Sequence, residues 1–218
     1  SLDLPPYSSK SLKQQGASVA VAKAAFKEMG YELNVSFFPW SRAVAFAKDD
    51  NSIYSGYFPE YYSAEIAEEF IYSNPMGSGP LGFAERKDNI IDWTTLNDLK
   101  EQRIGVVQDY INTTEFDKMV AMDLLRISTT TNDTTNLLKL VNNRLDLAVI
   151  DVNVMNYLLK TDTALINKAN NARFNKKILE NKKLYICFKK GKKGEQLSKI
   201  YNEGLKKIDI EKIMQQYL

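Results

Sequence analysis

Short β-prone segments alternate with amphipathic helical segments along most of this chain of 218 residues, and the alternation starts twice. In the first run, residues 17–29 and 40–48 have the apolar spacing of helices, and residues 33–38 and 53–54 have the composition of strands. Gly30 is expected to end the first helix. This order of strands and helices is typical of a mostly parallel sheet flanked by helices, so we predict an α/β fold.

The second run starts at Trp93, after a loop rich in glycine and proline at 73–80 and an extended segment at 81–85. Its predicted helices are 94–102, 113–122, 133–143 and 152–159, and its predicted strands are 104–107, 126–128 and 145–150. Residues 160–183 are polar and rich in lysine, and we expect little regular structure there. A buried strand at 184–188 and two amphipathic helices complete the chain.

The length is consistent with two lobes. Domains usually contain about 100–200 residues, so 218 residues form one large domain or two small ones. The hydrophobic fraction of 44% is sufficient for a buried core. We predict that residues 1–84 and 186–218 form lobe one and that residues 85–185, inserted between them, form lobe two. The predicted crossings between the lobes are extended segments near 81–87 and 180–186.

The chain contains no histidine and a single cysteine, Cys187. The absence of histidine removes the commonest general base, the Ser-His-Asp and Cys-His nucleophile systems, and most zinc and haem sites. One cysteine excludes an internal disulfide and a thiolate metal cluster. Lysine and arginine number 29 against 27 for aspartate and glutamate, which argues against a dedicated nucleic-acid binder. These absences make the ordinary enzyme classes poor candidates, and we predict no catalytic residues, metal or cofactor.

No apolar run approaches the roughly 18–20 residues that a membrane span requires, and no signal peptide is visible. These observations leave a cytosolic protein or a mature exported one. The alternation Ser1-Leu2-Asp3-Leu4 at the start is typical of a strand. We therefore expect that sequence upstream of Ser1 has been trimmed.

Aromatic side chains gather just after the predicted strands of the first run. In open α/β sheets, ligands bind beyond the carboxyl ends of the strands, and aromatic walls with a few polar groups are the usual lining of a small-molecule cleft. Tyr7, Trp40, Tyr54 and Phe58 are therefore candidate ligand contacts in lobe one. Any one of these rings could instead belong to the core.

Seven short motifs occur in order along nearly the whole chain. They are Pro5-Pro6-Tyr7, Met29-Gly30-Tyr31, Pro39-Trp40-Ser41-Arg42-Ala43, Tyr72-Ser73-Asn74-Pro75, Trp93-x-x-Leu96-x-Asp98-Leu99-Lys100, Arg103-Ile104-Gly105-Val106 and Asn143-Arg144-Leu145-Asp146. Together they resemble solute-binding protein family 3, the extracytoplasmic receptors of polar amino acid ABC importers and their relatives. The resemblance implies a periplasmic-binding-protein type II fold: two α/β lobes, each a mostly parallel sheet flanked by helices, with a two-strand hinge and the ligand trapped by closure.

The resemblance also implies roles for particular residues. Asp151 stands where the family has an acidic residue that grips the ammonium group of the ligand, although it could equally cap the helix that it precedes. Thr113, with Tyr110 nearby, lies in the segment that replaces the family's Gly-Thr-Thr, and could hold an anion. The family's carboxylate-clamping arginine has no counterpart in residues 63–69. Either another cation such as Arg42 replaces it, or the ligand is not an ordinary α-amino acid.

The function implied by the resemblance is extracytoplasmic binding of a small polar solute in an interlobe cleft, for delivery to the membrane permease of an ABC importer. The expected protein is a periplasmic monomer, free or membrane-anchored, with no nucleic-acid partner. Two alternatives stay open. One is the ligand-sensing domain of a membrane receptor, and the other is a cyclic-acid dehydratase on the same fold, which a cleft carboxylate with a raised pKa would favour.

Overall fold

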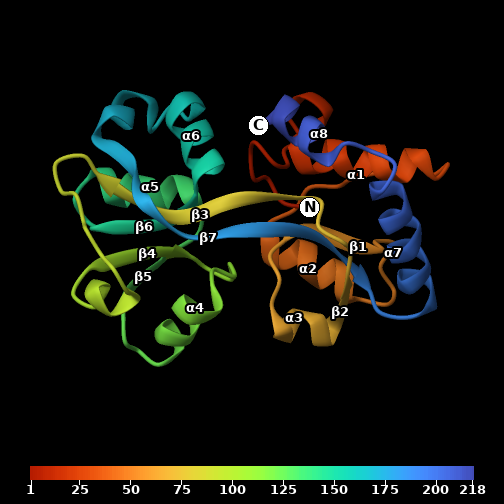
Figure 1. Cartoon of the computed structure of the whole chain (residues 1–218), viewed down its shortest axis with the longest axis horizontal. Helices are drawn as coiled ribbons and strands as arrows, with labels where there is room; N and C mark the ends of the chain where they lie inside the picture. The colour runs from red at the N-terminus through yellow and green to blue at the C-terminus, as the bar shows by residue number, and fades with distance from the viewer. The chain divides into compact units, whose positions relative to one another are not determined.

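The computed structural model describes all 218 residues, which divide into two compact units. Unit 1 contains Ser1–Ser78 and Lys183–Leu218, and unit 2 contains Gly79–Lys182. Both points of division fall inside strands, namely β3 (Gly77–Arg86) and β7 (Ala172–Lys189), whose course can be followed in Figure 1. The chain therefore passes between the units along extended segments.

The helices of unit 1 are α1 (Ala17–Glu28), α2 (Trp40–Lys48), α3 (Ala64–Glu69), α7 (Lys192–Leu205) and α8 (Ile210–Tyr217), and a 3-10 turn spans Lys13–Gln15. Helix α1 packs against both α7 and α8. Gly204 permits the close approach of α7, because a Cβ atom there would lie 2.0 Å from the carbonyl oxygen of Ala25. The rings of Phe26 and Tyr201, 5.1 Å apart, then fill the core between these two helices.

The strands of unit 1 are β1 (Gly56–Glu60), β2 (Phe70–Tyr72) and the C-terminal part of β7, which pairs with both of them. Cys187 of β7 stands opposite Tyr57 of β1 and Tyr72 of β2. Cys187, Tyr57, Ala47 and Phe70 form one buried cluster. The apolar run 184–188 is therefore the middle strand of this sheet, as its composition predicts.

Two strands predicted for this half of the chain are not formed. Residues 33–38 alternate between exposed and half-buried side chains until Phe37, as a strand does, but they belong to no assigned strand. Residues 53–54 also lie outside the sheet, and β1 starts only at Gly56. Alternation reports which side chains are buried, whereas a strand also needs a paired neighbour. The pairings of β1 and β2 with β7 are antiparallel, although the order of elements predicts a mostly parallel sheet.

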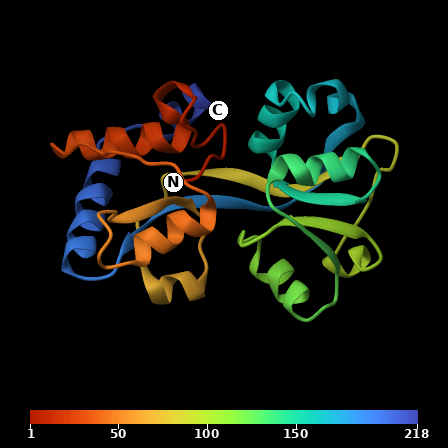
Figure 2. The ribbon, with the colours of Figure 1, turned by 180° about the vertical axis from the view of Figure 1, so that it is seen from behind.

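In unit 2, β4 (Arg103–Val107) lies between β5 (Arg126–Thr130) and β6 (Leu147–Asp151) and is parallel to both, while β3 is antiparallel to β6. Helices α4 (Thr114–Ala121), α5 (Asp133–Val141) and α6 (Val152–Thr161) follow these three strands in turn. Helix α5 packs on β4 and β6, as Figure 2 shows. The alternation of strands and helices predicted for the second run is therefore confirmed, except that 94–102 forms only the 3-10 helix Leu96–Leu99.

The expectation of little regular structure at 160–183 is wrong. This range contains the end of α6, a 3-10 helix at Ile166–Asn171 and the first half of β7, a strand of 18 residues. The side-chain amide of Asn175 donates to Glu85 Oε2 (2.7 Å) and to the carbonyl of Ile91 (2.8 Å). Arg173 Nε lies 3.3 Å from Glu85 Oε1. These polar contacts hold the start of β7, which is why a search for apolar runs misses it.

Candidate functional site

Three helices of unit 2 begin at the same edge of its sheet. Helices α4, α5 and α6 follow the parallel strands β4, β5 and β6, and their capping residues are Thr113, Asn132 and Asp151. The carboxyl ends of parallel strands meet at one edge, which is where α/β sheets bind ligands. This edge brings together the candidate residues predicted for lobe two.

Asp151 is only 6% exposed and caps α6. Its Oδ1 accepts hydrogen bonds from the backbone amides of Asn153 (2.7 Å) and Val154 (3.3 Å). The capping interpretation is therefore confirmed, while ligand contact stays a prediction. Because two amides fix the carboxylate, any group that it binds would meet it in a defined orientation.

Thr113 and Tyr110 lie on the short loop that follows β4. Thr113 is buried, and its hydroxyl accepts a hydrogen bond from the amide of Phe116 (3.3 Å). Tyr110 is half-buried. Asn112, between them, bonds to both carboxylate oxygens of Asp117 through its side chain (3.0 Å) and its backbone amide (2.9 Å). The loop is thus held in one conformation by its own side chains.

The inspection of the sequence missed Asp133, the first residue of α5. It is 8% exposed, and no side-chain hydrogen bond or ion pair of its carboxylate is present within the chain. Burial, and secondarily the negative charge of Asp151, raise the pKa of Asp133 to about 7. The sequence does contain a pattern that could have identified it. Asp133 lies after the predicted strand 126–128 and begins the predicted helix 133–143, just as Asp151 lies between the predicted strand 145–150 and the predicted helix 152–159. The edge therefore holds two buried carboxyl groups with interacting charges.

The candidates in unit 1 are not all in one place. Trp40 is half-buried at the start of α2, and its ring meets that of Tyr57 edge-on at a centroid distance of 5.3 Å. Tyr7 is 1% exposed, in a turn closed by hydrogen bonds between Leu4 and Ser8. Arg42 is exposed on α2, and no carboxylate of the chain forms an ion pair with it. Arg42 is therefore available to a ligand, whereas Tyr7 is part of the buried interior.

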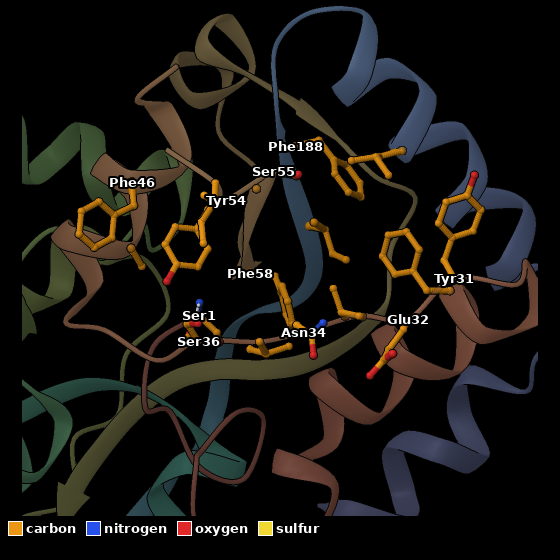
Figure 3. A pocket seen from close by; sticks show the side chains of 18 of the residues that line it. Ser1, Tyr31, Glu32, Asn34, Ser36, Phe46, Tyr54, Ser55, Phe58 and Phe188 are labelled. Atoms are coloured by element: carbon orange, nitrogen blue, oxygen red, sulfur yellow. Dashed lines mark hydrogen bonds between the residues drawn. The ribbon is translucent and has the colours of Figure 1, made fainter. Parts of the chain in front are cut away.

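Tyr54 and Phe58, by contrast, line the same pocket, which has a volume of about 290 Å³. Figure 3 shows their side chains beside those of Phe46 and Phe188. The ring of Phe38 packs edge-on against Phe46 (5.0 Å) and Tyr54 (5.4 Å). Neither Tyr7 nor Trp40 nor Arg42 belongs to this lining. The pocket is thus a separate feature from the surroundings of those three residues.

A buried polar cluster also escaped the inspection of the sequence. The Tyr57 hydroxyl donates to Glu60 Oε2 (3.1 Å), and the amide of Tyr61 donates to Glu60 Oε1 (2.8 Å). Burial, followed by the charge of Glu60, raises the pKa of the Cys187 thiol above its usual range. Since the thiolate is the reactive form of cysteine, Cys187 is a structural residue.

No group of three or more cysteine, aspartate or glutamate side chains is arranged to hold a metal ion. None of the helices is long and apolar enough to cross a membrane.

No family model and no curated protein matches the sequence. A histidine kinase sensor domain with similarity to periplasmic binding proteins shares 19% identity at a TM-score of 0.79, over 99% of this chain and 92% of that one. A Streptococcus pneumoniae amino acid ABC transporter substrate-binding protein bound to L-arginine shares 16% identity at a TM-score of 0.75, over 99% of this chain and 88% of that one. An ancestral amino-acid-binding protein, a precursor of cyclohexadienyl dehydratase, shares 19% identity at a TM-score of 0.74, over 99% of this chain and 92% of that one. At identities this low, the structural similarity shows the fold alone. The chain has the two-lobed α/β fold of the periplasmic binding proteins, as predicted.

Proposed function

We propose that this protein binds a small, polar, amino-acid-like solute outside the cytoplasm and delivers it to the permease of an ABC importer. The observation that carries the proposal is the carboxyl edge of the sheet in unit 2, where Asp151, Asp133 and Thr113 are buried at the starts of three helices. The likeness to a transporter protein bound to L-arginine supports the same class of ligand.

The charges at this edge favour a ligand that carries a cationic group. Two carboxyl groups lie close enough for the charge of Asp151 to raise the pKa of Asp133, and an ammonium or guanidinium group would offset that repulsion. In the proposed site Asp151 accepts hydrogen bonds from this cation, and Thr113 and Tyr110 contribute polar contacts from the neighbouring loop.

The test is a thermal-shift and calorimetry screen of basic, neutral and acidic amino acids and small amines. A true ligand at 100 times its dissociation constant adds about 2.7 kcal/mol to stability. Asp151→Asn should keep the cap of α6 but weaken binding of the cationic ligand at least tenfold. Asp151→Ala should lose both the helix cap and the binding. Asp209→Asn is the matched control, because Asp209 caps α8 in unit 1 through the amide of Lys212. Undiminished binding by Asp151→Asn would contradict the proposed role.

A sensory function would use the same binding site. The likeness to a histidine kinase sensor domain supports this alternative. The gene that encodes the chain distinguishes the two: a transmembrane helix followed by a kinase or cyclase domain indicates a receptor, and an adjacent permease gene indicates transport.

The raised pKa of Asp133 favours one further alternative, a cyclic-acid dehydratase, because a carboxyl group that titrates near neutral pH can act as a general acid or base. The assay is incubation with a prephenate-like cyclohexadienyl acid, with the aromatic product followed by ultraviolet absorbance. Turnover that Asp133→Asn abolishes would establish the enzyme. Absence of turnover in a protein that binds the compound would leave a binding function.

A further inference from the structure

Asp133 differs from the polar side chains around it, because no group of the chain binds its carboxylate. Thr130, the last residue of β5, donates through its hydroxyl to the carbonyls of Val106 (3.1 Å) and Asn132 (3.3 Å). The side chain of Asn132 accepts a hydrogen bond from the amide of Thr135 (2.8 Å), so helix α5 already has its cap. Asp133 is therefore a carboxyl group that is 8% exposed and has no structural partner.

No positive charge of the neighbouring elements compensates this carboxyl group. Helix α5 packs against β4, β5, β6 and α6. Besides the two aspartates, the titratable residues of these elements and of α5 are Arg103, Arg126, Lys139, Tyr157 and Lys160. The two arginines are the first residues of parallel strands, so they lie at the opposite edge of the sheet. The lysines and the tyrosine lie more than a turn beyond the first residues of their helices.

The nearby carboxylates do not stabilise Asp133 either. Asp162, at the end of α6, accepts a hydrogen bond from the hydroxyl of Thr134 (2.8 Å). The charge that acts on Asp133 is the negative charge of Asp151. The surroundings of Asp133 therefore oppose its ionised form.

The two aspartates are held differently. Two backbone amides donate to Asp151 Oδ1, and such hydrogen bonds favour the ionised form of Asp151. Asp133 accepts none, and a buried carboxyl group without a partner favours its neutral form. Burial and the charge of Asp151 accordingly raise the pKa of Asp133 to about 7. Below that pH, and without a cation at the edge, the proton of this pair lies on Asp133.

The carboxyl group of Asp133 also keeps contact with solvent. Five buried polar side-chain atoms of the chain have neither a hydrogen bond nor contact with solvent, and no oxygen of Asp133 is among them. A cationic group at the edge can therefore reach this carboxyl group. A buried carboxyl group avoids the cost of an uncompensated charge in two states, protonated or paired with a cation.

We propose that Asp133 is a proton-exchange residue of the proposed solute site: it holds a proton while the site is empty, and releases it to solvent when the cationic group of a solute binds beside Asp151. The O–H bond of the carboxyl group breaks, its electron pair stays on the carboxylate, and the solute cation takes the place of the proton. Asp151 alone is charged before the exchange, and two carboxylates and one cation are present after it, so the net charge stays at one negative unit. The inference rests on the proposed function, because it requires a cationic solute at this edge.

The exchange links solute affinity to pH. Since the proton and the solute cation compete for Asp133, affinity should rise with pH and level off above about 7. A neutral solute displaces no proton and gains nothing from the exchange. Asp133 thus makes the site selective for cationic solutes.

The test is calorimetry with L-arginine and L-lysine as probes, because the charges of both stay constant between pH 5.5 and 7.5. The wild type should bind a probe roughly tenfold or more tightly at pH 7.5 than at pH 5.5. At pH 6 it should release about one proton per bound probe, measured from the difference between the binding enthalpies in phosphate and in ACES buffer. Equal affinity at the two pH values, or no proton release, would overturn the exchange and leave the proposed function intact. Binding of neither probe at either pH would refute the proposed cationic solute and the exchange with it.

The variant Asp133→Asn separates this residue from other titrating groups, because its side chain is neutral at every pH. It should bind the probe at both pH values with the affinity that the wild type has at pH 5.5, and release no proton. The amino group of Ser1, with a pKa of about 6, titrates in the same range but is present in both chains. Asp123→Asn, at an exposed position, is the control and should keep the pH dependence of the wild type. The same pH dependence in the wild type and in Asp133→Asn would assign the proton to another group and contradict the proposal.

Discussion

At the scale of single residues, Asp133 gives a chain without histidine a group that titrates near neutral pH. Burial and the charge of Asp151 raise its pKa from 3.8 to about 7. Between these values the folded protein holds a proton that the unfolded chain releases, so the contribution of Asp133 to stability is present at low pH and is lost as pH rises to about 7. The loss is roughly 4 kcal/mol at most.

We expect Asp133→Asn to remove this pH dependence. The variant and the wild type should have similar unfolding free energies at pH 4, where Asp133 is protonated in the folded state. At pH 8 the variant should be more stable, by up to about 4 kcal/mol. Urea unfolding at pH 4, 6 and 8 measures the difference. Asp123→Asn, at an exposed position, is the control and should show no such divergence. Parallel pH curves for wild type and Asp133→Asn would refute the assignment.

At the scale of elements, the contrast between α2 and the start of β7 shows what a local pattern can predict. Helix α2 spans Trp40–Lys48, the range predicted from its apolar spacing, because helical hydrogen bonds form within the segment itself. The first half of β7 was not predicted, because it is held by Glu85, which lies 90 positions away from Asn175. Polar contacts between distant segments leave no periodic signal in either one.

Removal of the Asn175 side chain should therefore destabilise unit 2. Asn175→Ala deletes the hydrogen bonds to Glu85 and Ile91 and leaves a fully buried carboxylate with fewer donors. The expected loss is about 2 kcal/mol in the free energy of unfolding, measured with urea. Asn181 lies on the same strand but is exposed and makes no side-chain hydrogen bond. Asn181→Ala should thus change stability by less than about 0.5 kcal/mol, and equal effects of the two substitutions would show that the buried bonds are unimportant.

At the scale of the whole molecule, the two units differ in how the chain builds them. Unit 2 is one continuous segment, Gly79–Lys182, with its own mostly parallel sheet and buried core residues such as Phe83, Ile104 and Leu137. Unit 1 takes its middle strand from residues after Lys183, so Ser1–Ser78 lacks the partner that β1 and β2 need.

The segment Gly79–Lys182 should consequently fold when expressed alone, because a continuous segment with its own core has what a domain requires. We expect a cooperative urea transition and a dispersed amide NMR spectrum. Ser1–Ser78 alone should show neither, because the edges of β1 and β2 would be unpaired. A non-cooperative transition of the isolated 79–182 segment would contradict this division.

The sequence by itself determined the α/β class, the order of most elements and the position of Asp151 at the start of a helix, since these depend on spacing along the chain. Only the tertiary structure decided which segments pair. It left residues 33–38 outside the assigned strands, made 172–183 part of a long strand, and placed Asp133 close enough to Asp151 for their charges to interact. The physical reason is that pairing, burial and electrostatic interaction depend on distances in space, and residues distant in sequence set those distances.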